Sequence, residues 1–171
     1  MLHLLDTDVV SNLRKQTPNA QLIAWLKETP QEDFAIPLVV VFEIQRGVET
    51  LRLEGKAELA DQIEAWLNQM LDAAGVDGVL CPGVDVVRLQ AGMFADPALR
   101  NFLLPNPGSP KPKFGGDIII AAMAIVYQAA IVSFNVDDYL QIHQRYPLPG
   151  LFHPGRREWV LKPAEAADMV R

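Results

Sequence analysis

The sequence contains almost no cysteine, and this shortage removes two classes of site. Cys81 is the only cysteine among 171 residues, so no disulfide forms within the chain and no zinc site is built from several cysteines. The histidines His3, His143 and His153 are scattered without metal-ligand spacing, and each is interpreted as a surface or packing residue. A reducing compartment suits such a chain best.

The sequence also lacks a long hydrophobic run. Its most apolar later segment, residues 118–127, is about half of the ~20 residues that a membrane-spanning helix needs. Near the N-terminus, Asp6 and Asp8 interrupt the first apolar stretch, and no basic run precedes it. We therefore expect no signal peptide and no membrane contact, and we predict a cytoplasmic protein.

Positive charge is in short supply, because 15 Lys and Arg residues accompany 21 Asp and Glu residues and give a net charge of −6. This balance disfavours a broad basic surface for nucleic acid. Divalent cations held in an acidic pocket would reverse the field locally. Because half of the 171 residues are hydrophobic, the chain can fill one core but not two, and we expect a single domain over residues 1–171.

Short apolar runs alternate with amphipathic stretches along the chain. Strands are predicted at 2–5, 34–37, 79–81 and 130–134, and helices at 9–26 with a break at 17–19, 38–50, 51–74, 84–93 and 118–128. This order predicts an α/β fold whose mainly parallel central sheet is flanked by helices, with ligands at the carboxyl ends of the strands. Four prolines mark residues 104–113 as a loop, and the tail from Tyr146 is expected to be irregular.

Acidic residues stand where predicted strands end and helices begin. Asp6 follows the first strand, Asp8 comes two residues later, and Asp117 precedes a strongly apolar helix. A turn or a helix N-cap explains either Asp6 or Asp117 taken alone. The positive end of a helix would also keep Asp117 ionised and able to bind a cation.

Glu43 interrupts an otherwise apolar stretch, residues 38–44. Burying its carboxylate without a partner would cost several kcal/mol or more, so a cation is expected beside it. A bound metal ion is one candidate for that cation. A salt bridge to Arg46, one turn later on the same predicted helix, is the other.

Another polar cluster, residues 133–139, follows the last predicted strand. In it, Asn135 offers a neutral oxygen to a metal or to its water, and Asp138 supplies charge. An Asx-turn is the simpler explanation for both residues. Hard oxygen ligands without a cysteine or histidine cluster favour Mg²⁺ or Mn²⁺ over zinc.

Four segments, residues 4–11, 41–47, 117–122 and 132–139, carry a resemblance to the PIN-domain nucleases. Among these the chain most closely resembles the VapC-like toxins of bacterial toxin–antitoxin pairs. The first three acidic positions of that family fall on Asp6, Glu43 and Asp117. The fourth falls on Asn135, with Asp138 as its alternative, and the family often has Asn where Asp8 stands here.

The resemblance implies a PIN-like fold and a hydrolase that cuts RNA with water activated by Mg²⁺ or Mn²⁺. Asp6, Glu43 and Asp117 would be the metal ligands, and Asn135 or Asp138 would position the metal or the water. It also implies a homodimer and a cognate antitoxin, which often places a basic side chain in the acidic pocket. Basic residues that could flank the pocket and contact RNA are Arg14, Lys15, Arg46, Lys111 and Lys113.

Two alternatives stay open from the sequence alone. Residues 6–10 also resemble the opening motif of haloacid-dehalogenase-like phosphatases, in which Asp6 would be the nucleophile and Asp8 the general acid and base. Glu43 would then have no function. The second alternative is a non-catalytic PIN-like module that binds RNA or a partner, and Asn135 at an acidic position supports it.

Overall fold

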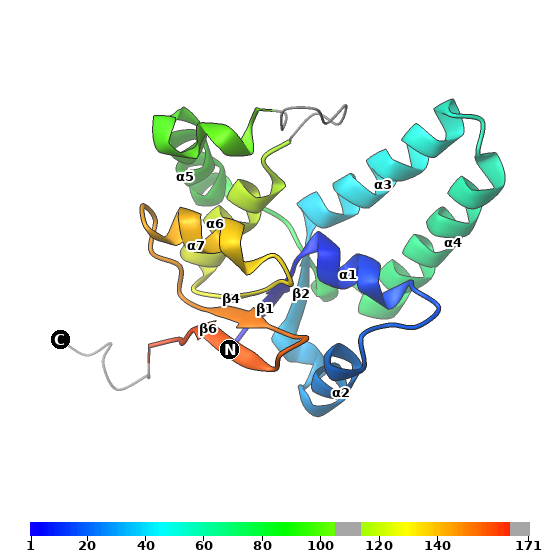
Figure 1. The fold of residues 1–171 in the computed structure, drawn as a ribbon, viewed down its shortest axis with the longest axis horizontal. Helices are drawn as coiled ribbons and strands as arrows, with labels where there is room; N and C mark the ends of the chain where they lie inside the picture. Colours follow the sequence, from blue (N-terminus) through cyan, green and yellow to red (C-terminus); the bar gives the residue numbers. More distant parts are fainter. Residues whose placement is uncertain (105–113, 165–171) are drawn as a thin grey trace.

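A computed structural model describes residues 1–104 and 114–164. Its centre is a six-stranded sheet in the order β3-β2-β1-β4-β5-β6, flanked by helices (Figure 1). Neighbouring strands from β3 to β5 pair in parallel, and only the β5–β6 pair is antiparallel. The predicted α/β architecture with a mainly parallel sheet is confirmed.

The strands are short, and a helix separates most of them. They are β1 (His3–Leu5), β2 (Phe34–Pro37), β3 (Val79–Leu80), β4 (Ala130–Val132), β5 (Leu151–His153) and β6 (Glu158–Leu161). The α-helices are α1 (Thr7–Leu13), α2 (Ala20–Glu28), α3 (Leu38–Leu53), α4 (Ala57–Ala74), α5 (Val84–Ala95), α6 (Gly116–Tyr127) and α7 (Val136–His143). Short 3₁₀ helices precede β2 and β3 and follow α5.

The helix boundaries follow local signals. The break expected at residues 17–19 separates α1 from α2, and the Asn19 side chain caps α2 by accepting hydrogen bonds from the backbone N–H groups of Gln21 and Leu22, both at 3.0 Å. A helix beginning at Leu51 was predicted, whereas α3 runs on to Leu53 and α4 begins only at Ala57. Between them Gly55 has φ +77°, a left-handed conformation that glycine adopts without strain.

The prediction of an irregular tail from Tyr146 is wrong for residues 151–161. Residues 151–153 and 158–161 form β5 and β6, which extend the sheet beyond β4. The strands are only three and four residues long and are surrounded by prolines, so their periodicity is too brief to detect. Helix α7 was also missed. The predicted loop at 104–113 lies outside the described residues except for Leu104.

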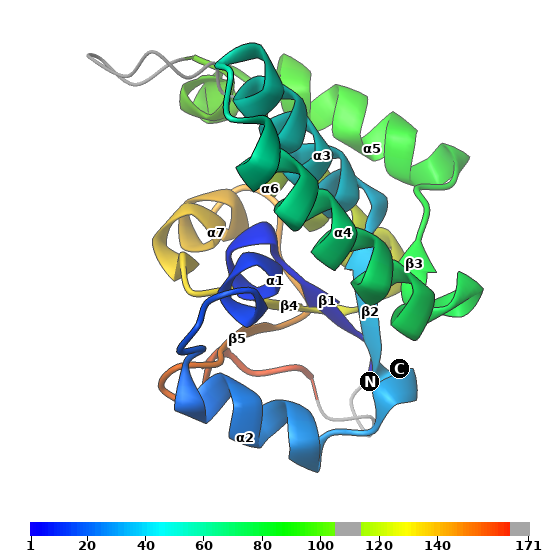
Figure 2. The ribbon, with the colours of Figure 1, turned by 90° about the vertical axis from the view of Figure 1, so that its right-hand side faces the viewer.

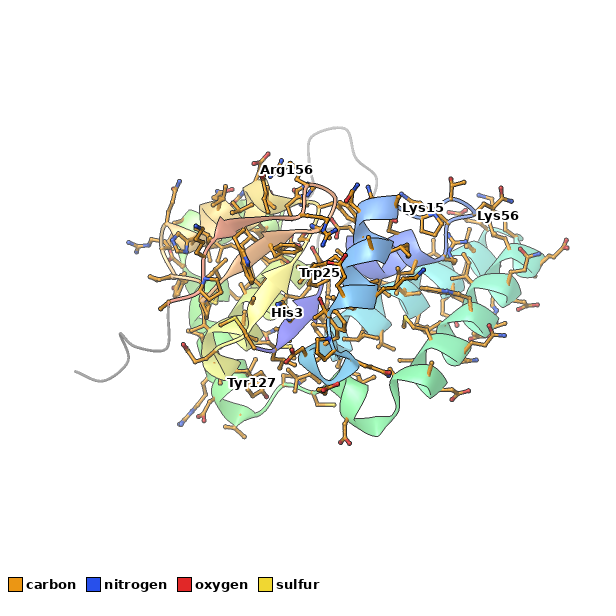
Figure 3. All side chains as sticks on the ribbon, turned by 90° about the horizontal axis from the view of Figure 1, so that it is seen from below. His3, Lys15, Trp25, Lys56, Tyr127 and Arg156 are labelled. Atoms are coloured by element: carbon orange, nitrogen blue, oxygen red, sulfur yellow. The ribbon has the colours of Figure 1, made fainter. Side chains whose placement is uncertain are left out.

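The core lies between the sheet and its helices. All residues of β1 and β4 are buried, and α6 is buried over most of its length, as expected for a helix that is apolar on all sides. His3 of β1 packs edge-on against Trp25 of α2 with ring centroids 5.5 Å apart (Figure 3). Across the described ranges, no helix combines the length and apolar character needed to cross a membrane.

Candidate active site

The sheet topology brings the acidic residues to one edge of the sheet. Strands β2, β1 and β4 are parallel neighbours, so their carboxyl ends share one edge of the sheet (Figure 2). Asp6 directly follows β1, and α3, which carries Glu43, directly follows β2. Helix α6 leads into β4 and returns against its direction, so the first turn of α6, with Asp117, begins at the same edge.

Asp6 is the most enclosed of these carboxylates, with 5% of its surface exposed. Its Oδ1 accepts a hydrogen bond from the Thr7 N–H at 2.6 Å, which caps α1. Its Oδ2 accepts one from the Ser133 hydroxyl at 2.7 Å. Burial raises the pKa of Asp6 well above its usual value, and the negative charges of Asp8 and Asp117 raise it further. Asp8 and Asp117 are therefore close enough for their charges to act on Asp6.

Asp8 ties α1 to the end of β4. Its Oδ2 accepts hydrogen bonds from the backbone N–H groups of Phe134 and Asn135, both at 3.0 Å, and lies 3.3 Å from the Ser133 Oγ. Its Oδ1 is buried and has no hydrogen-bond partner. Burial raises the pKa of Asp8, although the two backbone donors oppose the shift. Asp8 thus orders the loop after β4. It also places beside Asp6 a carboxylate with one oxygen that accepts no hydrogen bond.

Glu43, on α3, contacts the chain neighbours of Asp6 and Asp117. Its carboxylate accepts a hydrogen bond from the Thr7 hydroxyl and lies directly against the Cα of Gly116, because a Cβ built on Gly116 would stand 3.0 Å from the Glu43 Cδ and closer still to Oε1. A Glu43–Arg46 pair is not among the salt bridges found for residues 1–104 and 114–164. Glu43 is therefore held between Thr7, which follows Asp6, and Gly116, which precedes Asp117.

Asn135 and Asp138 pair with each other at the start of α7. The Asn135 Nδ2 donates to the Asp138 Oδ2 at 2.6 Å, and the Asn135 backbone N–H donates to Asp8. The Asn135 side chain is exposed and Asp138 is half-buried. The structure thus joins these two residues to the loop that Asp8 orders, and their role toward a metal or water stays a prediction.

Comparison with solved structures identifies the same fold in toxin–antitoxin complexes. FitAcB from Neisseria gonorrhoeae matches with a TM-score of 0.63 and 23% identity over 90% of this chain and 98% of the matched chain. VapBC-1 from nontypeable Haemophilus influenzae matches with a TM-score of 0.53 and 18% identity over 84% and 94%, respectively. VapBC2 from Rickettsia felis, solved with a promoter DNA fragment, matches with a TM-score of 0.53 and 17% identity over 82% of this chain and 92% of the matched chain.

The chain has a PIN-domain fold. No protein-family model matches the sequence, and no curated protein does either. The predicted PIN-like fold is confirmed by structural similarity in which fewer than a quarter of the aligned residues are identical.

The PIN fold also places beside the carboxylates two side chains that the sequence analysis did not single out. Ser133 is fully buried and lies within hydrogen-bond distance of both Asp6 and Asp8. Tyr139 is fully buried on α7; burial and then the charges of Asp6, Asp117 and Asp8 raise its pKa well above its usual value. A hydroxyl right after a strand signals Ser133, whereas α7 itself was not predicted and nothing drew attention to Tyr139.

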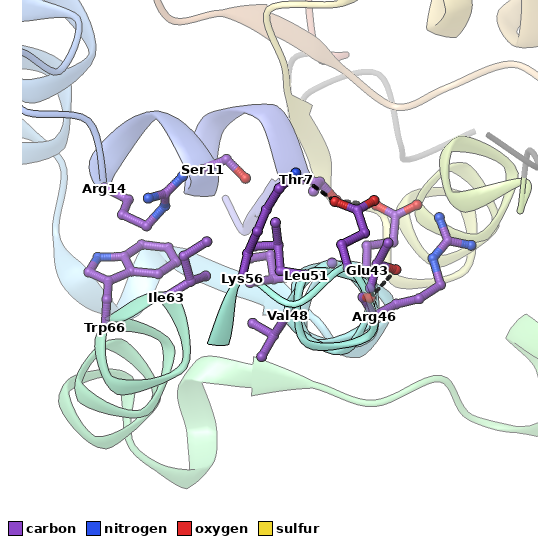
Figure 4. Close-up of a pocket in the computed structure, with 14 residues that line it drawn as sticks. Thr7, Ser11, Arg14, Glu43, Arg46, Val48, Leu51, Lys56, Ile63 and Trp66 are labelled. Carbon is purple, nitrogen blue, oxygen red and sulfur yellow. Dashed lines mark hydrogen bonds and ion pairs between the residues drawn. The ribbon is translucent and has the colours of Figure 1, made fainter. Parts of the chain in front are cut away.

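A groove of about 890 Å³ opens beside the carboxylates, between α1 and the α3–α4 hairpin (Figure 4). Thr7 and Glu43 stand at one end of it, and Ile63 and Trp66 at the other (Figure 4). The basic residues along it are Arg14, Arg46 and Lys56. Two of the five predicted basic residues therefore line this groove, Lys15 does not, and Lys111 and Lys113 lie outside the described residues.

The donor chemistry of the site fits a hard divalent cation. All of the side-chain donors around Asp6 are oxygens, and the Asp8 Oδ1 is buried without a hydrogen-bond partner. Within residues 1–104 and 114–164, however, no three His, Cys, Asp or Glu side chains are placed so that they could hold a metal ion together. The site thus has suitable ligands that are not arranged as a finished coordination shell.

Gly116 offers a test of how Glu43 is positioned. In Gly116→Ala the new methyl group would displace the Glu43 carboxylate, which is the end of a flexible side chain, so we expect the unfolding temperature to change little. If the chain cleaves RNA and Glu43 acts in the site, cleavage should fall by about 10-fold to 100-fold, the range typical for residues that support metal ligands. Gly92→Ala on α5 is the matched control, because no atom lies within 4 Å of its added Cβ. Equal loss in both variants would contradict this role.

Proposed function

We propose that this chain is a Mg²⁺- or Mn²⁺-dependent endoribonuclease and the toxin of a toxin–antitoxin pair. The observation that carries the proposal is the burial of Asp6 beside Asp8 and Asp117, whose charges raise its pKa. Keeping such carboxylates ionised is costly unless a cation joins them. Asp6, Glu43 and Asp117 would hold that cation.

The side chains of the site have separable tasks in this proposal. A bound divalent ion would supply an activated water and would stabilise the charge that builds on the phosphate. Ser133 and the Thr7 N–H fix the two oxygens of Asp6, while Thr7 and Gly116 fix the carboxylate of Glu43. Asn135 and Asp138, paired at the start of α7, would orient the water or a further ligand of the metal.

The ligand set is expected to close when the cation binds. Glu43 has three rotatable side-chain bonds, and within residues 1–104 and 114–164 the hydrogen-bond donor found for its carboxylate is the Thr7 hydroxyl, so it can exchange that bond for a metal contact at small cost. Asp6 is held at both oxygens and would move least. Asp6 would therefore provide the fixed ligand of the cation, and Glu43 would move to become a further ligand when the cation binds.

The proposed partners are an RNA substrate, a second copy of the chain and a protein antitoxin in the cytoplasm. Structures matched by this fold include FitAB and VapBC complexes and a toxin–antitoxin complex from Klebsiella pneumoniae. The groove beside Glu43 combines an apolar lining, including Ile44, Val48 and Ile63, with charged groups. A segment of an antitoxin with apolar anchors and a basic side chain would suit both the groove and the carboxylates.

The test of this function is cleavage by the purified chain. RNA and single-stranded DNA of the same sequence are incubated with Mn²⁺, with Mg²⁺ and with EDTA, and products are resolved by length. We expect internal cuts in RNA that need the cation and disappear with EDTA. Cleavage that persists in EDTA would contradict the metal mechanism. Intact RNA together with no Mn²⁺-dependent rise in unfolding temperature would instead indicate a non-catalytic binding module.

A further inference from the structure

Two aromatic rings stack on the surface next to the candidate active site. Phe42 and Phe114 lie with ring centroids 4.7 Å apart and planes inclined by 29°. They expose 46% and 36% of their surface, respectively. Stacked rings this exposed gain little from the core, so their remaining faces are available to a ligand.

A cation adjoins the stack. Arg46 follows Phe42 by one helical turn on α3, and its guanidinium carbon lies 5.6 Å from the centroid of the Phe114 ring. Arg46 also lines the groove beside Glu43 (Figure 4). In a chain with net charge −6, this arginine is a local positive group next to an aromatic surface, a combination that suits a base together with its phosphate.

The stack is tied to the carboxylates through both of its segments. Phe42 directly precedes Glu43 on α3, and Phe114 stands two residues before Gly116, whose Cα touches the Glu43 carboxylate. Asp117 follows at once. A nucleotide whose phosphate lay at the carboxylates could therefore place a neighbouring base on the rings.

We propose that Phe42, Phe114 and Arg46 form a stacking subsite for an unpaired base of RNA beside the cleaved phosphate. This inference rests on the proposed ribonuclease function and adds a substrate class, because only a base outside a duplex can present its face to the rings. Arg46 contacts the phosphate of that nucleotide. Stacking tolerates any base, and a purine binds best because it stacks most strongly.

The experiment measures binding to a short oligouridylate that carries one 2-aminopurine, whose fluorescence falls when this base stacks. The chain carries Asp6→Asn so that the RNA stays intact. We expect strong quenching with this chain, and about 10-fold to 100-fold weaker binding with loss of quenching when Phe42→Ala and Phe114→Ala are added. Leu53→Ala, at a side chain 91% exposed on the same helix, is the matched control and should change neither readout. Replacing both rings by Leu keeps apolar volume and should still abolish quenching.

The outcomes separate this inference from the function on which it rests. If the unsubstituted chain cuts RNA while the double variant binds and quenches equally well, the subsite is wrong and the ribonuclease stands. If neither cleavage nor RNA binding occurs in the unsubstituted chain, both fail. If the double variant loses only self-association in sedimentation, the rings belong to a dimer interface and the subsite is again overturned. Unchanged circular dichroism melts verify that the variants are folded.

Discussion

Replacing Asp6 by Asn should abolish RNA cleavage while leaving the fold at least as stable as before. Asn keeps a side-chain oxygen for the Thr7 N–H and is as good an N-cap as Asp, so α1 should still begin at Thr7. It removes a carboxylate whose pKa is raised by burial and by Asp8 and Asp117. If a metal supplies several kcal/mol of transition-state stabilisation, the rate should fall by about a thousand-fold.

Two measurements on the same protein preparations check this expectation. Cleavage rates are compared in Mn²⁺, and unfolding temperatures are compared with and without Mn²⁺. Asp85→Asn is the matched control, since Asp85 is exposed in the first turn of α5 and should affect neither quantity. Full activity in Asp6→Asn would remove Asp6 from the mechanism, and a Mn²⁺-dependent rise in its unfolding temperature equal to that of the unsubstituted chain would remove it from the metal site.

Without added metal, the chain should become more stable on mild acidification. The pKa values of Asp6 and Asp8 lie above the ordinary 3.8 in the folded state. Between the ordinary pKa and the raised pKa of the folded state, the folded state therefore holds more protons than the unfolded state. The free energy of unfolding then falls as the pH rises from about 4 through the folded pKa. We expect a higher unfolding temperature at about pH 5 than at pH 7, and a smaller difference in Asp6→Asn.

Divalent cations should reverse this trend, because they bind the ionised carboxylates. Saturating Mn²⁺ should raise the unfolding temperature more at pH 7 than at about pH 5, where protons compete for the same oxygens. Carboxylates with lowered pKa, such as Glu64 and Asp96, act in the opposite direction. Their contribution to the free energy of unfolding is the same in the unsubstituted chain and in Asp6→Asn, so it cancels when the two proteins are compared. If the unfolding temperatures of the two proteins depend on pH in the same way, both with and without Mn²⁺, the pKa of Asp6 is not raised in the folded state.

The order of strands and helices was predictable because it depends on local patterns. The apolar strand before Asp6, the helix that carries Glu43 and the apolar helix after Asp117 are each confirmed. Residues 151–161 were not predictable, because strands of three or four residues give too short a pattern and pair only once β4 is in place. Helix α7 was not predictable either, because its polar first turn suggested a loop.

The identities of the candidate acids were predictable, whereas their surroundings were not. Sequence position alone singled out Asp6, Glu43 and Asp117 as carboxylates at a strand end, in an apolar helix and at a helix start. The contact of Glu43 with Thr7 and Gly116 joins residues far apart in the chain. The alternative in which Arg46 pairs with Glu43 is not seen, and Arg46 lies over the Phe114 ring instead.

The sequence by itself determined most of the strands and helices, which acids are candidates for the site and the shortage of cysteine, because these follow from residue types and spacings a few positions long. Only the tertiary structure decided that Ser133 lies between Asp6 and Asp8, that Tyr139 is buried among the carboxylates' charges, and that two phenylalanines stack beside them. Parallel pairing of β1, β2 and β4 brings these distant residues to one edge, and no local pattern encodes that convergence.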